Sequence, residues 1–336
     1  MTMLNLGKVL VCSALVSGAT WARAREPSPE PPLAAWKLLY YERGSGAAAI
    51  GALDDRSGHT TLTEYKPNAF GTWSHIVGDA SEIFFYDMYT GNAAVGEVSR
   101  EGKFSTKFTL DGFKGGWTHI VRHRDYLFFY NTDTGAATVG RIEKGAFRTY
   151  NNGEKPFPAG WTHITSTPSG LFLYNQANGA AVSGEWQYGE AVKGSGEITH
   201  VSFRPRFSYP VDALAKNWTH VVSTAAGLLF YRASDGHHEL ADLAESGLLS
   251  TRPPTATAFR PGWTHVVACD EQVLFYDGGN GDGVIAALRK VRVKAEDGKP
   301  DDKDAGSLIL RKSYPGMFTP GYTHIVTTVD PPVAPR

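Results

Sequence analysis

The chain has 336 residues, with 33 lysines and arginines against 34 aspartates and glutamates, so its formal net charge is −1. A nearly neutral chain without basic clusters argues against a nucleic-acid-binding protein and against one attracted to anionic membranes. Its 37 glycines, 15 tyrosines and 17 phenylalanines favour an all-β protein with many tight turns.

Residues 1–24 have the features of a secretory signal peptide. Lys8 is a basic start, Val9 to Ala19 is an apolar core, and Ala22 to Ala24 forms a small-x-small cleavage site. The apolar core is too short to span a bilayer as a permanent anchor. No other apolar run approaches that length, so we expect a secreted protein, extracellular or periplasmic, without membrane insertion.

Cleavage would remove Lys8 and Arg23, which leaves 31 basic residues against 34 acidic ones and a net charge of −3. It would also leave Cys269 without a second cysteine, and we interpret Cys269 as a small buried apolar residue. The segment 25–32, REPSPEPP, indicates a flexible leader, and 330–336 an extended tail.

A pentapeptide close to Trp-Thr-His-Ile-Val occurs six times in the chain. The copies start at Trp73, Trp117, Trp161, Trp218, Trp263 and Tyr322, with spacings of 44, 44, 57, 45 and 59 residues. A period near 45 residues, made of short strands, is typical of a β-propeller with about four strands per blade.

The second copy predicts one complete blade. Its four strands are expected at 117–121, 127–130, 136–142 and 146–150. The turn NTDTG between the second and third strands is rich in Asx residues and ends in glycine, which is a hairpin signal.

The second strand of the blade also occurs six times, and a tyrosine ends every copy. The copies lie at 38–41, 83–86, 127–130, 171–174, 228–231 and 273–276. The repeats therefore start at a second strand and stop at a first strand. The strand at Tyr322 can complete the first blade, so we predict an all-β, six-bladed propeller of four-stranded blades over 33–329, closed by its C-terminal strand.

A Trp-x-x-Ile-Val strand, followed by Leu-Phe-Tyr-Asp and a Thr-Gly turn, resembles the repeats of FG-GAP/VCBS-like bacterial propellers. It is also similar to tachylectin-type and tectonin-type lectin propellers, over residues 33–329. FG-GAP units usually carry an Asp-rich calcium loop between their first two strands, and the loops here lack its pattern of acidic residues and glycine. We therefore expect no metal and no cofactor, and we interpret GGNGDG at 278–283 as a turn.

One rim of the disc is expected to collect the repeated aromatic residues and the turns. Aromatic faces beside short polar side chains suit a sugar, because the ring stacks on C–H groups while the polar groups bond hydroxyls. The candidate ligand-binding residues are Trp73, Trp117, Trp161, Trp218, Trp263, Tyr322, His75, His119, His163, His220, His265, His324, Tyr86, Tyr130, Tyr174, Asp87, Asn131 and Asn175.

The same residues also fit a purely structural role. The aromatic side chains can wedge between blades, and the six histidines can form a ring of bonds from each imidazole to a neighbouring blade's backbone. The strand register is open: Val77 opposite Ile83 is one pairing, and a one-residue slip that sets Trp73 opposite Tyr86 is the other.

These features favour a monomeric binding protein over an enzyme. Our leading hypothesis is multivalent carbohydrate recognition, in which weak equivalent sites add their affinities. The alternative is a protein-interaction or adhesion scaffold that uses the insertions at 188–199 and 294–306. An enzyme is a third possibility, although no paired-acid signature, GxSxG motif or P-loop is present.

Overall fold

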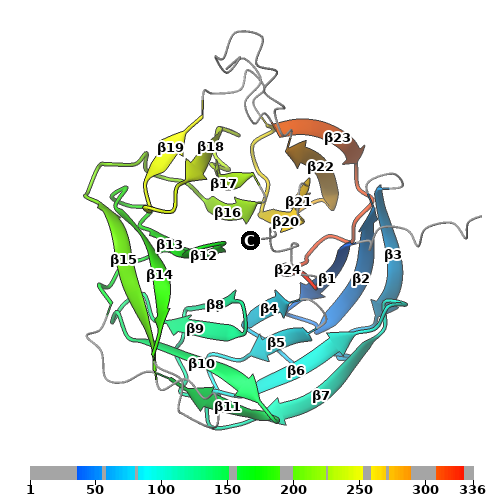
Figure 1. Cartoon of the computed structure of the whole chain (residues 1–336). Helices are drawn as coiled ribbons and strands as arrows, with labels where there is room; N and C mark the ends of the chain where they lie inside the picture. Colours follow the sequence, from blue (N-terminus) through cyan, green and yellow to red (C-terminus); the bar gives the residue numbers. More distant parts are fainter. Residues whose placement is uncertain are drawn as a thin grey trace, which may run out of the picture. The chain divides into compact units, whose positions relative to one another are not determined.

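The computed structural model describes residues 36–54, 58–79, 82–150, 157–189, 200–224, 226–252, 259–269, 272–288 and 308–328. These residues form six four-stranded antiparallel sheets, arranged as blades around a central axis (Figure 1). No helix occurs in the described ranges. The prediction of an all-β, six-bladed propeller is confirmed.

In each blade the strands run from the innermost to the outermost in the order named. Blade 1 contains β24 (His324–Thr327), β1 (Trp36–Glu42), β2 (Ala47–Asp54) and β3 (Gly58–Tyr65). Blade 2 contains β4 (His75–Asp79), β5 (Glu82–Tyr86), β6 (Ala93–Val98) and β7 (Phe104–Leu110). Blade 3 contains β8 (His119–His123), β9 (Tyr126–Tyr130), β10 (Ala137–Glu143) and β11 (Ala146–Thr149).

The other three blades follow the same plan. Blade 4 contains β12 (His163–Thr167), β13 (Gly170–Tyr174), β14 (Ala181–Tyr188) and β15 (Val201–Tyr209). Blade 5 contains β16 (His220–Thr224), β17 (Gly227–Tyr231), β18 (His238–Leu243) and β19 (Leu249–Thr251). Blade 6 contains β20 (His265–Cys269), β21 (Gln272–Asp277), β22 (Asp282–Leu288) and β23 (Leu308–Tyr314).

Every inner strand begins at the histidine of the repeat, two residues later than the sequence pattern predicted. The reason is that the preceding tryptophan belongs to the connector between blades. The backbone N–H of Trp161, for example, donates to the hydroxyl of Tyr130 in the previous blade at 3.2 Å. The aromatic residue is thus held by the neighbouring blade before its own strand starts.

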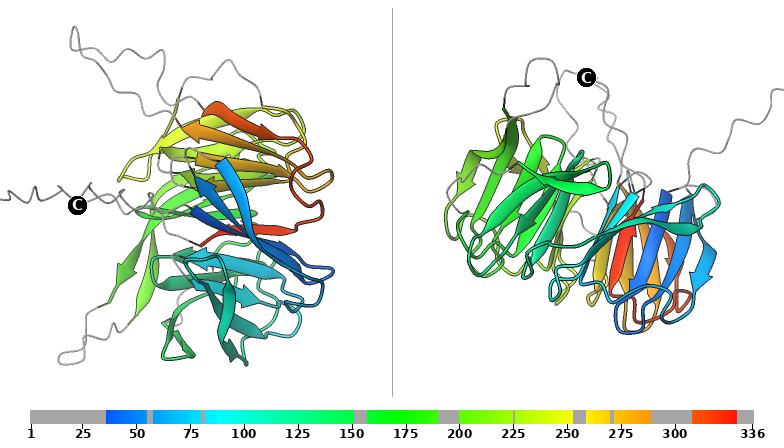
Figure 2. Two further views of the ribbon diagram at one scale, coloured as in Figure 1. Left: turned by 90° about the vertical axis from the view of Figure 1, so that its right-hand side faces the viewer. Right: turned by 90° about the horizontal axis from the view of Figure 1, so that it is seen from below.

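The C-terminal strand closes the ring as predicted. β24 pairs antiparallel with β1, with His324 opposite Tyr41 and Thr327 opposite Leu38. Figures 1 and 2 show β24, drawn in red, beside the blue β1. This pairing covers an edge of β1 that would otherwise be free to pair with another chain.

Both registers considered from the sequence are wrong. His75 lies opposite Tyr86, and Val77 lies opposite Phe84. The reason is a tight hairpin, because Asp79 pairs with Glu82 and leaves only two residues between the strands. The same register recurs in blade 3, where His119 lies opposite Tyr130.

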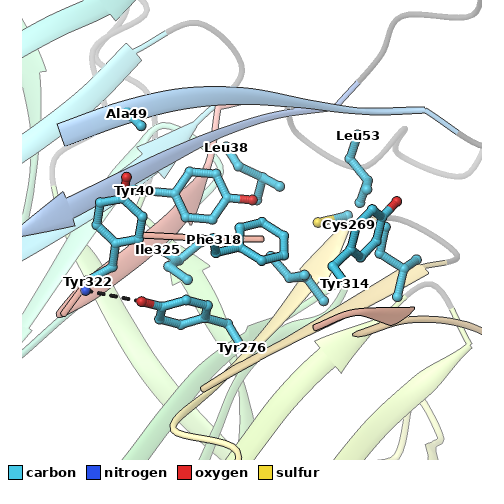
Figure 3. Packing of buried hydrophobic residues seen from close by; sticks show 12 residues of the cluster. Leu38, Tyr40, Ala49, Leu53, Cys269, Tyr276, Tyr314, Phe318, Tyr322 and Ile325 are labelled. Carbon is cyan, nitrogen blue, oxygen red and sulfur yellow. Dashed lines mark hydrogen bonds between the residues drawn. The ribbon is translucent and has the colours of Figure 1, made fainter. Parts of the chain in front are cut away.

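The core consists of the second strands and the spaces between blades. In β5, β9 and β17 the apolar side chains and the final tyrosine are almost fully buried. Figure 3 shows the cluster that joins blade 6 to blade 1, with Tyr40, Phe318 and Tyr322 packed on Tyr276 and Cys269. Cys269 is buried, as expected.

The turn between the second and third strands needs glycine in every blade. The six glycines have φ between 69° and 76°, a region that side chains rarely adopt. They are Gly46, Gly91, Gly135, Gly179, Gly236 and Gly281. An added Cβ at each would meet the carbonyl oxygen of the connector that follows the blade, so these turns and connectors gather on one rim.

Several predicted segments lie outside the described residues. They are the signal peptide at 1–24, the leader at 25–32, the tail at 330–336 and most of the two insertions. Among the residues with assigned structure, none form a helix long and apolar enough to cross a membrane.

Candidate functional site

The six repeated histidines form a closed ring of hydrogen bonds around the axis. The imidazole Nε2 of each contacts the backbone carbonyl oxygen just before the histidine of the next blade. The distance is 2.9–3.0 Å for His75, His119, His163, His220 and His324. The Nδ1 atom lies 2.8–3.0 Å from the hydroxyl of the serine or threonine before it. Because a carbonyl only accepts, Nε2 carries the hydrogen and Nδ1 accepts from the hydroxyl.

Burial keeps this ring neutral. It lowers the pKa of His75, His119, His163, His220, His265 and His324. The pKa of His324 falls to about 4, and the charges of His75, His265 and Arg43 add to the effect of burial. Both ring nitrogens of each histidine are engaged, and Nε2 joins its blade to the next, which is the structural role considered for these residues.

The repeated tyrosines join each blade to the connector that leaves it. Their hydroxyls donate to a connector carbonyl oxygen at 2.6–2.9 Å, as Tyr86 does to Lys114, Tyr130 to Pro158 and Tyr174 to Ala215. The rings are fully buried, and burial raises the pKa of each hydroxyl. These hydroxyls are therefore already engaged within the protein.

The aromatic residues at the start of the pentapeptide pack into the spaces between blades. Five are buried, with exposed fractions of 2–9%, and Trp73 is half-buried. The buried five are Trp117, Trp161, Trp218, Trp263 and Tyr322. A sugar that stacked on these rings would have to displace core contacts.

The Asx residues after the tyrosines cap their own turns. Asp87 accepts from the backbone N–H of Tyr89 and from the hydroxyl of Thr90. Asn131 and Asn175 accept backbone N–H groups of their turns and donate to the carbonyl oxygens of Gly116 and Gly160. A role of the aromatic, histidine and Asx residues in ligand binding stays a prediction.

A second site, which the sequence analysis did not single out, lies on the rim of blade 6. We call it the rim pocket, and its volume is about 360 Å³. It is lined by Phe259, Arg260, Trp263, Asp282, Gly283, Val284, Leu310, Ser313 and Pro315. Ligand sites of proteins typically have volumes in this range and combine apolar walls with a few polar groups.

Arg260 is the central polar group of the rim pocket. Its guanidinium lies 4.3 Å from the centre of the Trp263 ring. Nη1 donates to Asp282 and Nη2 to Asp277, both at 2.6 Å. The hydroxyl of Tyr231 in blade 5 donates to the backbone oxygen of Arg260 at 2.9 Å, so the neighbouring blade helps to place this residue.

Asp282 is the acidic group that lines the rim pocket. One of its oxygens accepts from Arg260 and from the amide of Asn280, and the other accepts from the backbone N–H of Gly316 at 2.7 Å. The Arg260 guanidinium and the Gly316 N–H hold the pKa of this carboxyl below its ordinary value. Asp282 is therefore ionised near neutral pH.

The rim pocket also contains an unmatched donor. The indole Nε1 of Trp263 is buried and has no hydrogen-bond partner among the described residues. Buried polar atoms are nearly always hydrogen-bonded, and each exception asks for an explanation. Because this nitrogen is inaccessible to solvent, a ligand in the pocket would reach it only if the indole or its neighbours moved.

Blade 5 carries a similar cluster of side chains, which does not line the rim pocket. The guanidinium of Arg232 lies 5.5 Å from the centre of the Trp218 ring and pairs with Asp235. His237 stacks on the same indole. This cluster is a natural control for the rim pocket, because it repeats the arginine, tryptophan and aspartate at residues that do not line that pocket.

Arg260 and Asp282 had a weak signal in the sequence. The connectors of the other blades carry Gly71, Lys114, Pro158, Ala215 or Thr319 where blade 6 has Arg260. GGNGDG was correctly interpreted as a turn, but its acid also lines the pocket. Residues at which one blade departs from the others indicate the blade that differs. They do not show which side chains come into contact.

In the described ranges, no three His, Cys, Asp or Glu side chains gather as a metal site would require. The fold defines the class of the protein, a six-bladed β-propeller. No family model matches the chain, and no curated protein sequence is similar to it.

Solved structures with this fold include two named as lactonases. A candidate 6-phosphogluconolactonase from Bacteroides fragilis superposes with a TM-score of 0.57 at 9% identity, covering 89% of this chain and 99% of the other. The periplasmic gluconolactonase of Pseudomonas aeruginosa superposes with a TM-score of 0.53 at 11% identity, covering 87% of this chain and 98% of the other.

The hypothesis of a non-catalytic, multivalent carbohydrate-binding protein is wrong. The two propellers reported above are named as lactonases, and no family model supports an FG-GAP or lectin assignment. The physical reason for the error lies in the aromatic residues, because a repeated tryptophan beside polar groups has the same sequence pattern whether it faces a ligand or the next blade. The protein-scaffold alternative depended on insertions that lie mostly outside the described residues.

Proposed function

We propose that this propeller is a hydrolase that opens a lactone, a cyclic ester, with the rim pocket as its active site. The observation that carries the proposal is one guanidinium shared by two carboxylates at the edge of an apolar cavity. Ester hydrolysis needs a donor for the developing oxyanion and a base for the attacking water, and this arrangement offers both.

Arg260 would bind the carbonyl oxygen of the lactone. Among the described residues, two of its five N–H groups are used, one on each carboxylate, and the others are available to a ligand. A guanidinium stays protonated, so it stabilises the negative charge that forms on this oxygen. Asp277 would act as a positioning residue that holds the guanidinium from its second side.

Asp282 would be the general base. Its carboxylate offers about four acceptor positions and uses three in the described structure, which leaves one for a water molecule. The water oxygen attacks the carbonyl carbon while its proton passes to Asp282. The ring C–O bond then breaks, and the leaving alkoxide takes that proton, so the product is a hydroxy acid and the carboxylate is restored.

The names of the two superposed propellers support this reaction class. One is named as a gluconolactonase and the other as a candidate 6-phosphogluconolactonase, and both names denote lactone hydrolysis. The Pseudomonas protein is also named as periplasmic. This name agrees with the predicted export of the present chain. Export, the monomeric state and the resemblance to FG-GAP/VCBS-like repeats all stay predictions.

The experiment is a proton-release assay of purified protein on a panel of lactones, with the spontaneous rate subtracted. The variants are Asp282→Asn and Arg260→Gln, and the matched controls are Asp235→Asn and Arg232→Gln in the blade 5 cluster. We expect the two pocket variants to lose about 10²–10³-fold in kcat/KM and the controls to retain activity. A rate equal to the spontaneous one over the whole panel would overturn the proposal.

A further inference from the structure

We infer that the rim pocket takes an uncharged lactone with an apolar substituent, and that it discriminates against phosphorylated or otherwise anionic sugar lactones. The inference rests on the proposed function and names the substrate class of that same site. It is carried by two observations on the pocket, namely its walls and its charge.

The walls away from Arg260 and Asp282 are mainly apolar. Phe259 and Trp263 come from the connector that enters blade 6, Val284 from β22, Leu310 from β23 and Pro315 from the segment after β23. Leu310 is 53% exposed, and it stands on the outermost strand of the blade. A leucine at the open side of a cavity can cover an alkyl or acyl chain and gain the free energy of removing both surfaces from water.

The charges of the site oppose an anionic substrate. Arg260 is the only cation among the lining residues, and it is already paired with Asp277 and Asp282. With both carboxylates paired to it, the guanidinium carries no positive charge that is left uncompensated. A phosphate group would need cations beyond those of this site, because phosphate recognition relies on several N–H donors and positive charge.

The test measures kcat/KM on γ-lactones whose alkyl substituent grows from methyl to octyl, beside glucono-δ-lactone and its 6-phosphate. We expect a rise of up to about fourfold per methylene while the chain still contacts the walls, since burying a methylene contributes about 0.8 kcal/mol. Binding of the matching lactams, followed by tryptophan fluorescence, should show the same dependence on chain length without turnover.

Leu310→Asp should flatten the chain-length series, because a carboxylate replaces the apolar wall. The matched control is Leu248→Asp, which changes a leucine of similar exposure that does not line the pocket. A flat series in the unchanged protein, or a preference for the 6-phosphate, would overturn this inference and leave the proposed function standing. Absence of turnover on every lactone would instead overturn the proposed function, and the inference with it.

Discussion

The imidazole Nε2 of His324 lies 2.9 Å from the carbonyl oxygen of Ser74, two residues that stand 250 positions apart in the chain. His324 belongs to the last strand and Ser74 precedes the inner strand of blade 2, so this bond completes the histidine ring. Each histidine bonds forward to the next blade, and the ring is closed only when β24 has paired with β1. The stability of the propeller therefore depends on these imidazoles remaining neutral.

Lowering the pH should destabilise the fold between about pH 6.5 and pH 4. The unfolded chain takes up protons on its histidines below their ordinary pKa of 6.5, whereas folding lowers the pKa of His324 to about 4. The unfolded state then binds more protons, so the free energy of unfolding falls as the pH falls through this window. Urea unfolding at a series of pH values measures this dependence.

His324→Gln should weaken that pH dependence, since it removes one proton-binding group that differs between the two states. His237→Gln is the control, because its ring lies outside the histidine ring. Equal unfolding free energies at neutral pH and near pH 4 in the unchanged protein would contradict the prediction.

Two adjacent tyrosines should respond in opposite ways to removal of their hydroxyl. Tyr40 is 1% exposed, and its hydroxyl has no partner among the described residues. Blades 2 and 3 carry a phenylalanine at the same position, namely Phe85 and Phe129. Tyr40→Phe should therefore raise the free energy of unfolding by about 1 kcal/mol.

Tyr41→Phe should lower the free energy of unfolding by about 1–3 kcal/mol. The hydroxyl of Tyr41 donates to Gly71 at 2.6 Å and accepts from the backbone N–H of Trp73 at 2.8 Å, and both groups would lose their partner. Chemical denaturation of the two variants side by side decides the matter, and a shift of the same sign in both would refute the argument.

Closure by β24 predicts a sharp dependence on chain length at the C-terminus. A chain that ends at Gly321 lacks β24 and exposes the edge of β1, so it should lose cooperative unfolding and self-associate. A chain that ends at Thr328 keeps β24 and should unfold like the full protein. Circular dichroism melting and light scattering measure both properties, and a cooperative monomer ending at Gly321 would contradict the role of closure.

Gly78 should not accept a side chain, although its equivalents in other blades carry one. An added Cβ would meet the backbone oxygen of Thr327 in β24. Gly78→Ala should therefore cost about 1–3 kcal/mol of unfolding free energy. Ala268→Gly, at the matching position of blade 6, should cost less than about 1 kcal/mol, and its thermal unfolding provides the comparison.

Tyr231 should affect turnover through Arg260. Tyr231→Phe removes the hydroxyl that bonds the backbone of Arg260, so lactone turnover should fall about tenfold in kcat. Tyr174→Phe breaks the equivalent bond to Ala215, one blade earlier and outside the rim pocket, and should lower stability by a similar amount without changing kcat. Equal kcat values for the two variants would show that Tyr231 has only a structural role.

The sequence by itself determined the architecture of this protein. Six pentapeptides, six second strands that end in tyrosine and a glycine in every turn after them specify the same blade six times, and the order of the first and last strands specifies the closure. The architecture can be predicted from sequence because strand propensity, the alternation of apolar and polar residues and turn chemistry are local properties. A repeated sequence shows each of these properties several times. The possibility of a histidine ring followed from the same repetition.

Only the tertiary structure decided the strand register and the direction in which the repeated aromatic side chains face. A register is set by pairing between strands, and a slip of one residue reverses the face of every side chain. The rim pocket also depends on residues that are brought together from a connector, a hairpin turn and an outer strand. Arg260, Asp282 and Leu310 lie up to 50 positions apart, and only their packing in blade 6 makes them one site.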